Sequence, residues 1–434
     1  MQANANAICP LLWAAVAQGL PLEMTARNAL GRTCSADAFW RLIQLAVWND
    51  RGQTVASMCV RYSLPLNASM LLTCAARFGS MHAASALLHA KASVNGLSYR
   101  ASLQIEGLPW FHANRTPLLQ AAHLGHIDML GLLVSAKANV EMPNGRRGTP
   151  LLVAAARGHA ECVALLLNVK AIADARYLDG DTALHAVSSV AVAQLLLDAK
   201  AQAHARNSAR ETAIWCTTRR GGDDAALTQC LLDAHASVHE SDRDDYTLLH
   251  LASSQGNRAV ASVLVKAKAD VNASDDDGVT PLACAAGWPA TVAFLLKKRA
   301  DVHAIDGYYV AETPLFKAAT IGCEVSASLL LRAKAVVDAR NYHGVTPLYV
   351  AATNGWESVV SVLLAAKAEV DYADAEYRTP LFSAVRCHCT AVVRVLLEAK
   401  ADATKTDIDS KTPLWYAQKN KHARIVALLV AATR

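Results

Sequence analysis

The stretch at residues 247–279, TLLHLASSQGNRAVASVLVKAKADVNASDDDGV, decides the fold because the chain repeats it. Related stretches open at a series of threonines that lie 33 residues apart, with one interval of 30 residues and one of 35. These threonines are Thr116, Thr149, Thr182, Thr212, Thr247, Thr280, Thr313, Thr346, Thr379 and Thr412. A fixed period of this length predicts an array of stacked, similar units rather than one globular core.

Each unit carries the signals for two helices and a loop. The triplet Thr-Pro-Leu at 346–348 predicts a helix start, because threonine caps free amides and proline leaves no amide unpaired. The alanine pair 351–352 allows close helix packing, and Gly355 ends this first helix. The apolar run at 359–364 predicts a second, half-buried helix. The polar residues that follow are long enough for a hairpin-like finger.

The pattern TPLxxAAxxG, followed by LLxxxADVNA at a period of 33 residues, resembles the ankyrin repeat. The resemblance covers roughly residues 69–434 and implies an all-α ankyrin-repeat solenoid of about eleven helix-turn-helix units with β-hairpin-like finger loops. The first unit opens near residue 70, and the others open at the ten threonines. Proteins of this family usually bind partners on a concave face made of finger tips and first helices.

Two parts of the chain depart from the repeat. Residues 1–68 carry it only in degenerate form, and we interpret them as an N-terminal helical region of capping repeats; a separate small helical domain is the alternative. The first finger contains an insertion at 96–115 that includes Tyr99, Trp110 and Phe111. These aromatic residues either anchor a partner or fold back onto their own helices.

Composition limits the classes of protein. The chain has 434 residues, is 53% hydrophobic and 18% charged, and has a net charge of +5, which does not by itself imply nucleic acid. The 11 cysteines are scattered, so we expect reduced cysteines in a monomer of the cytoplasm, or of the nucleus. No apolar run has the length of a membrane helix, so no transmembrane segment is expected.

We find no catalytic, cofactor or metal motif in the sequence. Cys387-His388-Cys389 looks like a metal-binding fragment, but no second ligand pair lies near it. His185 and His250 occupy the fourth position of the TPLH-like opening, which is a structural place in this family. We therefore expect no enzyme activity, no cofactor and no metal.

A cation follows every second helix, where the family usually has glycine in a left-handed conformation. These residues are Lys91, Lys137, Lys170, Lys200, His235, Lys268, Arg299, Lys334, Lys367 and Lys400. Because the spacing downstream is unchanged, we expect a left-handed backbone at each of them, at a cost of about 1 kcal/mol. They either complement the helix dipole or form a row that binds an anionic partner.

A second row lies at the fourth position of the last four units, which holds Phe316, Tyr349, Phe382 and Trp415. It either packs one repeat on the next or faces a ligand. Packing is the more common use of such a ladder, and we expect it here.

The candidate partner-binding residues are the aromatic residues of the insertion together with residues at the motif positions of the family, which lie just before each opening threonine and after each alanine pair. They are Tyr99, Trp110, Phe111, Arg115, His123, Arg146, Arg147, Arg157, Arg219, Arg220, Tyr246, Tyr309, Tyr342, His343, Thr353, Asn354, Arg378 and Arg386. Some fingers are basic, whereas Asp242–Asp245 and Asp275–Asp277 are acidic, and this mosaic suits one shaped protein better than a uniform polyanion.

The sequence thus predicts a non-enzymatic scaffold or adaptor that binds a protein partner of unknown identity, with nucleic acid not expected. One alternative is a polyanion or membrane-surface binder that uses the row of cations, and steep salt dependence would distinguish it. A second alternative is a regulatory or targeting module of an enzyme complex, which requires a catalytic partner.

Overall fold

The computed structural model describes residues 46–53, 55, 68–96, 115–143, 148–221, 224–307 and 311–433. Its described elements are all helices, apart from isolated β-bridges between Ser241 and Thr247 and between Asp306 and Glu312. The all-α prediction is therefore confirmed. The two bridges lie at the bases of fingers, as a hairpin-like loop requires.

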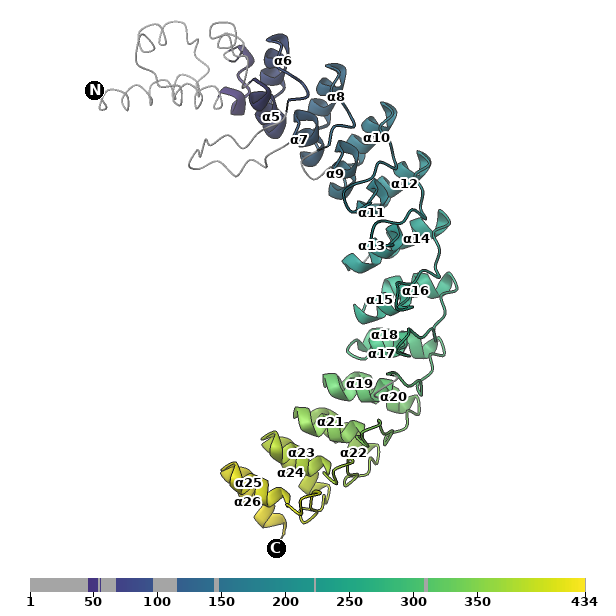
Figure 1. Cartoon of the computed structure of the whole chain (residues 1–434), viewed down its shortest axis with the longest axis vertical. Coiled ribbons are helices and arrows are strands. Elements are labelled where there is room, and N and C mark those ends of the chain that lie inside the picture. Colours follow the sequence, from purple (N-terminus) through teal and green to yellow (C-terminus); the bar gives the residue numbers. More distant parts are fainter. Residues whose placement is uncertain are drawn as a thin grey trace, which may run out of the picture. The chain divides into compact units, whose positions relative to one another are not determined.

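The chain divides into two compact units. Unit 1 comprises the described residues up to Thr217 with Asp233–His235, and unit 2 comprises Thr218–Leu232 with Ala236–Arg434. The boundary falls within helix α13 (Ala213–Arg220). Each unit is a stack of helix pairs, and Figure 1 shows the pairs in sequence order.

Unit 1 alternates first helices of four to eleven residues with second helices of nine residues. They are α5 (Ala68–Phe78), α6 (Met81–His89), α7 (Pro117–Leu124), α8 (Ile127–Ser135), α9 (Pro150–Arg157), α10 (Ala160–Asn168), α11 (Ala183–Ala186) and α12 (Val190–Asp198). First helices pack on first helices and second on second, so α5, α7, α9 and α11 form one layer.

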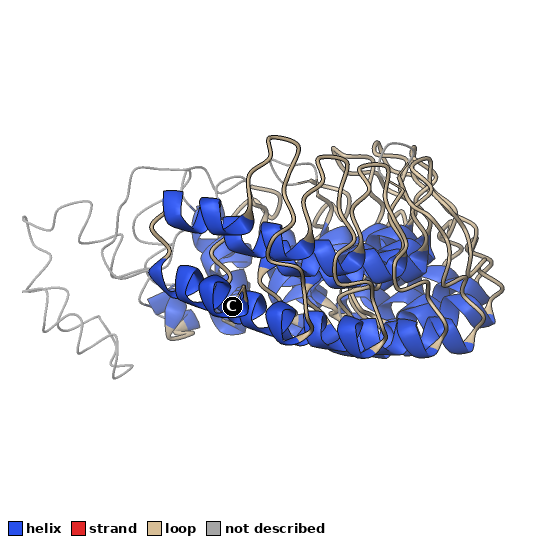
Figure 2. Ribbon diagram, turned by 90° about the horizontal axis from the view of Figure 1, so that it is seen from below, coloured by secondary structure: helices blue, strands red, loops and turns tan. Residues whose placement is uncertain are grey.

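Unit 2 continues the same alternation. It contains α14 (Ala225–Asp233), α15 (Leu248–Ser254), α16 (Arg258–Lys266), α17 (Pro281–Cys284), α18 (Pro289–Lys297), α19 (Pro314–Ile321), α20 (Glu324–Arg332), α21 (Pro347–Asn354), α22 (Glu357–Ala365), α23 (Pro380–Arg386), α24 (Thr390–Glu398), α25 (Pro413–Lys419) and α26 (Ala423–Ala432). In Figure 2 the helices lie in layers, and the finger loops extend to one side of them.

The local signals act as the sequence predicts. The Thr346 hydroxyl accepts a hydrogen bond from the Tyr349 amide at 3.2 Å, and Gly355 ends α21 with φ at +79°. Ala351 and Ala352 are fully buried, as is Leu363 of α22. Burying each leucine of this kind contributes about 2 kcal/mol, so the two helices are stable only when neighbouring pairs cover them.

The ten residues that replace glycine after the second helices are left-handed, as predicted, with φ between +61° and +75°. At α20 the Lys334 amide donates to Leu331 O at 2.9 Å, and the Ala335 amide donates to Leu330 O at 3.0 Å. This pair of bonds is the Schellman motif, which satisfies the last carbonyl groups of a helix. The backbone therefore keeps the left-handed conformation that is usual for glycine, although none of these residues is glycine.

The aromatic row of the last four repeats is buried at three of its positions. Phe316, Tyr349 and Phe382 are at most 9% exposed, and the Phe382 ring contacts the Tyr416 ring of the next repeat, with the centroids 4.9 Å apart. Trp415 is 36% exposed and belongs to the last described pair, α25 and α26. The Nζ atoms of Lys411 and Lys419 lie 5.1 and 4.7 Å from its ring centroid, so cations cover part of its face.

Candidate functional site

The fingers of unit 2 are held at their bases by a recurring acidic or amide side chain. Asp374 Oδ1 accepts hydrogen bonds from the amides of Glu376 and Arg378, both at 2.9 Å. Asp242, Asp275, Asn341 and Asp407 make the same pair of bonds in their own fingers. Such side chains replace the backbone partners that a two-stranded ladder would supply.

Successive fingers of unit 2 are also joined at their tips. The Ala375 amide donates to His343 O at 3.1 Å, and the Ile408 amide donates to Glu376 O at 3.0 Å. Asp276 donates in the same way to Asp244 O at 2.9 Å. The backbone of the tips is therefore fixed, and their side chains project from a preorganised support, which lowers the entropy cost of binding.

Three large apolar side chains stand exposed on these joined tips. Tyr342 is 70% exposed, Tyr377 is 64% exposed and Ile408 is 64% exposed. They come from three consecutive fingers, and we call them the tip strip. Exposed aromatic residues on a rigid backbone are the type that dominates protein–protein interfaces.

Arg378 forms its ion pairs within its own finger. Its guanidinium lies 2.7 Å from Asp374 Oδ2 and 2.6 Å from Glu376 Oε2, and Asp374 also accepts from the Tyr349 hydroxyl at 3.0 Å. Burial works against the charge of Arg378, but these carboxylates outweigh it and raise the pKa of Arg378. Burial likewise opposes ionisation of Asp374, but its bonds to Arg378 leave its pKa below the usual range.

Tyr246 is half-buried rather than free at a tip. Its ring stacks on His250 with the centroids 5.0 Å apart, and its hydroxyl lies 3.6 Å from Cys284 Sγ. Burial raises the pKa of Tyr246, so the hydroxyl stays neutral. This candidate presents only one edge to a partner.

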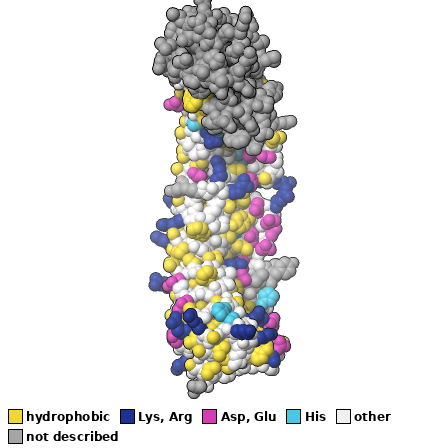
Figure 3. Space-filling view, turned by 90° about the vertical axis from the view of Figure 1, so that its left-hand side faces the viewer, with side chains coloured by type: hydrophobic (Ala, Val, Ile, Leu, Met, Phe, Trp, Pro, Cys, Tyr) yellow, Lys and Arg dark blue, Asp and Glu magenta, His cyan; other side chains and the backbone are white. Residues whose placement is uncertain are grey.

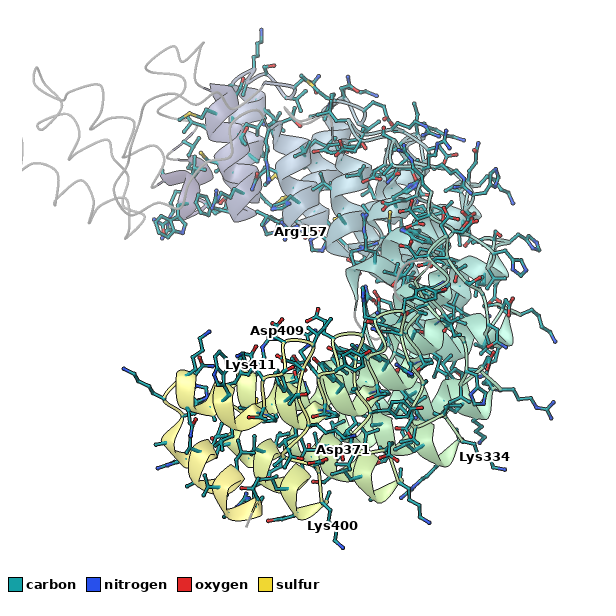
Figure 4. All side chains as sticks on the ribbon, turned by 60° about the horizontal axis from the view of Figure 1, so that its bottom comes forward. Arg157, Lys334, Asp371, Lys400, Asp409 and Lys411 are labelled. Carbon is teal, nitrogen blue, oxygen red and sulfur yellow. The ribbon has the colours of Figure 1, made fainter. Side chains whose placement is uncertain are left out.

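Unit 1 gathers several of the basic candidates on its first helices. Arg157 Nη2 donates to His123 Nε2 at 3.3 Å, and Arg115 Nη1 donates to Gln120 Oε1 at 3.2 Å. Burial first, and then the charges of Arg157 and Arg77, lower the pKa of Arg115. Figure 4 shows Arg157 at the end of α9. The structure thus brings Arg115, His123 and Arg157 into one basic group.

The remaining candidates are distributed as follows. Arg219, Arg220, His343, Asn354 and Arg386 are exposed, and Thr353 is half-buried with its hydroxyl bonded to Tyr349 O. Six others lie outside the described residues, namely Tyr99, Trp110, Phe111, Arg146, Arg147 and Tyr309.

Sequence reasoning missed Tyr377, Ile408 and Arg77. The motif rule took residues just before each threonine and so included Tyr342 and His343, but it left out Tyr377 and Ile408, which lie two and four positions before their threonines. The anchor at Asp374 or Asp407, five positions before the threonine, is the signal that locates the tip. Arg77 directly follows the alanine pair of α5, so it lies at one of the motif positions although it was not among the candidates.

The fingers of unit 2 before the tip strip are acidic. Asp242, Asp244, Asp245, Asp276 and Asp277 are exposed there, interrupted by Arg243. Figure 3 shows acidic and basic side chains interspersed on the face in view. The finger edge therefore changes from acidic to aromatic along unit 2, and a partner must match that order.

His185 and His250 hold the helix starts. The Thr182 amide donates to His185 Nδ1 at 3.1 Å, and the Thr247 amide donates to His250 Nδ1 at 3.0 Å. The Nε2 atoms donate across to Glu211 O and Val279 O, at 3.1 and 2.9 Å. Burial lowers the pKa of both imidazoles. Their buried rings serve the backbone and are not placed for proton transfer to a substrate.

Metal binding and membrane insertion find no support in the part of the chain that the structure describes. No three histidine, cysteine or acidic side chains converge there, and Cys387 is exposed. No described helix combines the length and the apolar character that a membrane span requires. Cys74 is a buried free cysteine, and burial raises its pKa to about 12.

Comparison with known proteins agrees with this architecture. A three-copy model of ankyrin repeats matches residues 118–207, 213–306 and 369–433, and a single-repeat model matches residues 343–375. The chain belongs to the ankyrin-repeat family. Repeats of this family are in general protein–protein interaction modules, and the family is generally non-enzymatic.

One curated relative extends this comparison. An ankyrin repeat-containing protein of Schizosaccharomyces pombe is 35% identical over 68 residues. That stretch covers 16% of this chain and 32% of the relative, so the chain spans about a third of the relative's length.

Proposed function

We propose that the protein is a scaffold or adaptor that binds a protein partner on the face formed by its finger tips and first helices. The observation that carries the proposal is the tip strip, where Tyr342, Tyr377 and Ile408 stand at least 64% exposed on joined fingers. Exposed aromatic side chains cost solubility, and an interface is the usual reason to keep them.

The acidic fingers before the tip strip support a protein partner over a uniform polyanion. A nucleic acid or an anionic membrane would meet Asp242, Asp244 and Asp276 as like charges. A protein can instead present cations to these fingers and apolar side chains to the tip strip. Catalysis has no part in this proposal, and the partner supplies any chemistry.

The proposal also covers the organisation of the whole repeat array. We propose about eleven repeats that begin near residue 69, since helix pairs recur from α5 onward. Residues 1–68 would then serve as a cap, and we place the monomer in the cytoplasm or nucleus.

The test is an affinity purification from the native cell with two baits. The wild type is compared with a Tyr342→Ser, Tyr377→Ser, Ile408→Ser variant, whose backbone anchors are intact. We expect a protein that the wild type retains at physiological salt and the variant loses. Equal capture by both baits would show that the partner binds elsewhere.

A further inference from the structure

A second charged surface lies where the second helices α16, α18 and α20 end, before the fingers that follow them. Seven exposed cations gather there in three consecutive repeats of unit 2, and we call them the basic corner. They are Lys266, Lys268, Lys297, Lys298, Arg299, Arg332 and Lys334. Figure 4 shows Lys334 extending away from the ribbon.

Helix capping explains only part of this charge. The second helices α8, α10 and α12 of unit 1 end with a single cation each at the left-handed position, namely Lys137, Lys170 and Lys200. One cation is enough to complement a helix dipole. The additional cations Lys266, Lys297, Lys298 and Arg332 are therefore in excess of what the helix ends require.

Nothing described in the structure neutralises the basic corner. None of its seven side chains forms an ion pair within the described part of the chain. Asp270 and Asp301 are the two nearest carboxylates in sequence, and they offset at most two of the seven cations. Their side chains accept hydrogen bonds from the amides of Asn272 at 2.9 Å and His303 at 2.8 Å. The surface keeps a net positive charge.

We infer that the basic corner binds an acidic, extended segment of a protein partner. Successive repeats lie roughly 10 Å apart, which matches the distance between every third residue of an extended chain. Asp270 and Asp301 lie between the cations and would repel a continuous line of phosphates, whereas a peptide can place neutral residues opposite them. The inference rests on the proposed protein-binding function and adds a second contact, separate from the tip strip.

The test measures binding of a synthetic peptide to the full chain. The probe is a fluorescent peptide of about 12 residues with glutamate at every third position, and its partner has glutamine there. The corner variant is Lys266→Gln, Lys297→Gln, Lys298→Gln, Arg332→Gln. The matched control is Lys91→Gln, Lys137→Gln, Lys170→Gln, Lys200→Gln, which removes the same charge from unit 1. Glutamine keeps the helix propensity close to that of lysine.

We expect the glutamate peptide to bind the wild type and the control alike, and the corner variant about tenfold more weakly. The glutamine peptide should bind none of them. Equal weakening in the corner variant and the control would overturn the inference, because net charge alone would then explain binding. No binding of the glutamate peptide to the wild type would overturn it as well.

Two further probes separate the classes of polyanion. Phosphatidylserine vesicles and a DNA duplex are titrated at about 150 mM salt. Tighter binding of either one than of the peptide, lost in the corner variant, would contradict the inference in favour of that polyanion. The tip-strip variant should bind the peptide normally. Whether the tip-strip variant loses the captured partner tests only the proposed function. The two proposals can therefore fail independently of each other.

Discussion

The left-handed lysines show how one residue carries two opposing effects. Lys334 has φ at +69°, where a side chain costs about 1 kcal/mol relative to glycine. Its positive charge at the C-terminal end of α20 interacts favourably with the helix dipole, which offsets part of this cost. The net effect of the lysine on folding stability is therefore close to zero or unfavourable. Folding stability alone does not explain why all ten positions avoid glycine.

We expect Lys334→Gly to raise the free energy of unfolding by up to about 0.7 kcal/mol, because it relieves the left-handed strain and loses only the smaller dipole interaction. Lys266→Gly, at the last residue of α16, should lower it instead, by less than the roughly 1 kcal/mol that glycine costs in a helix interior. Urea denaturation of both variants measures the difference. The same sign for the two substitutions would contradict the strain at Lys334.

The buried histidines make a prediction about pH. Burial holds the pKa of His185 and His250 below 6.5, so their contribution to stability is present above that pH. It is lost as the pH falls below 6.5 towards the folded value, since the unfolded chain takes up protons first. We expect the thermal midpoint to fall between about pH 7.5 and pH 5.5.

The double variant His185→Gln, His250→Gln is the control for this pH dependence. It lowers stability at neutral pH, because the hydrogen bonds to Thr182 and Thr247 weaken. Its thermal midpoint should depend less on pH than that of the wild type. A parallel decline in both proteins would assign the pH dependence to other groups.

At the scale of elements, the finger depends on one carboxylate. Asp374 is 6% exposed and holds two amides, the Arg378 guanidinium and the Tyr349 hydroxyl. Its removal leaves four donors without their acceptor in a half-buried place. The position of Tyr377 at the tip follows from this anchor.

We expect Asp374→Ala to cost about 3 kcal/mol and to loosen the finger, because a buried hydrogen-bonded ion pair loses one partner. Asp409→Ala removes an exposed carboxylate from the next finger and should cost less than about 0.5 kcal/mol. Chemical denaturation gives both values. Similar losses would show that the anchor contributes no more than a surface charge.

The repeat and the helix ends could be predicted from the sequence, because Thr-Pro-Leu at 346–348 and Gly355 act through local backbone chemistry. The exposure of Tyr377 and the burial of Tyr246 could not be predicted from the sequence. Both lie close before an opening threonine, and only the contacts of Tyr246 with His250 and Cys284 separate them. Exposure at a tip depends on neighbouring repeats, which a motif position does not contain.

At the scale of the molecule, each repeat is stabilised by its neighbours. Leu363 of α22 is fully buried, and α22 packs on α20 and α24. Leu363→Ala should cost about 2–5 kcal/mol. We expect hydrogen exchange to accelerate first in α20–α24 and less in α15 and α16, because coupling in repeat proteins passes between nearest neighbours. Uniform acceleration across unit 2 would contradict this local coupling.

The central claim is that the tip strip binds a protein, and titration of the captured partner tests it most directly. We predict that Tyr342→Ser, Tyr377→Ser, Ile408→Ser weakens the affinity at least tenfold, which corresponds to about 1.4 kcal/mol. A control variant, Ile172→Ser, Val325→Ser, removes exposed apolar side chains away from the tips and should bind as the wild type does. An unchanged affinity of the tip variant, or an equal loss in the control, would contradict the account.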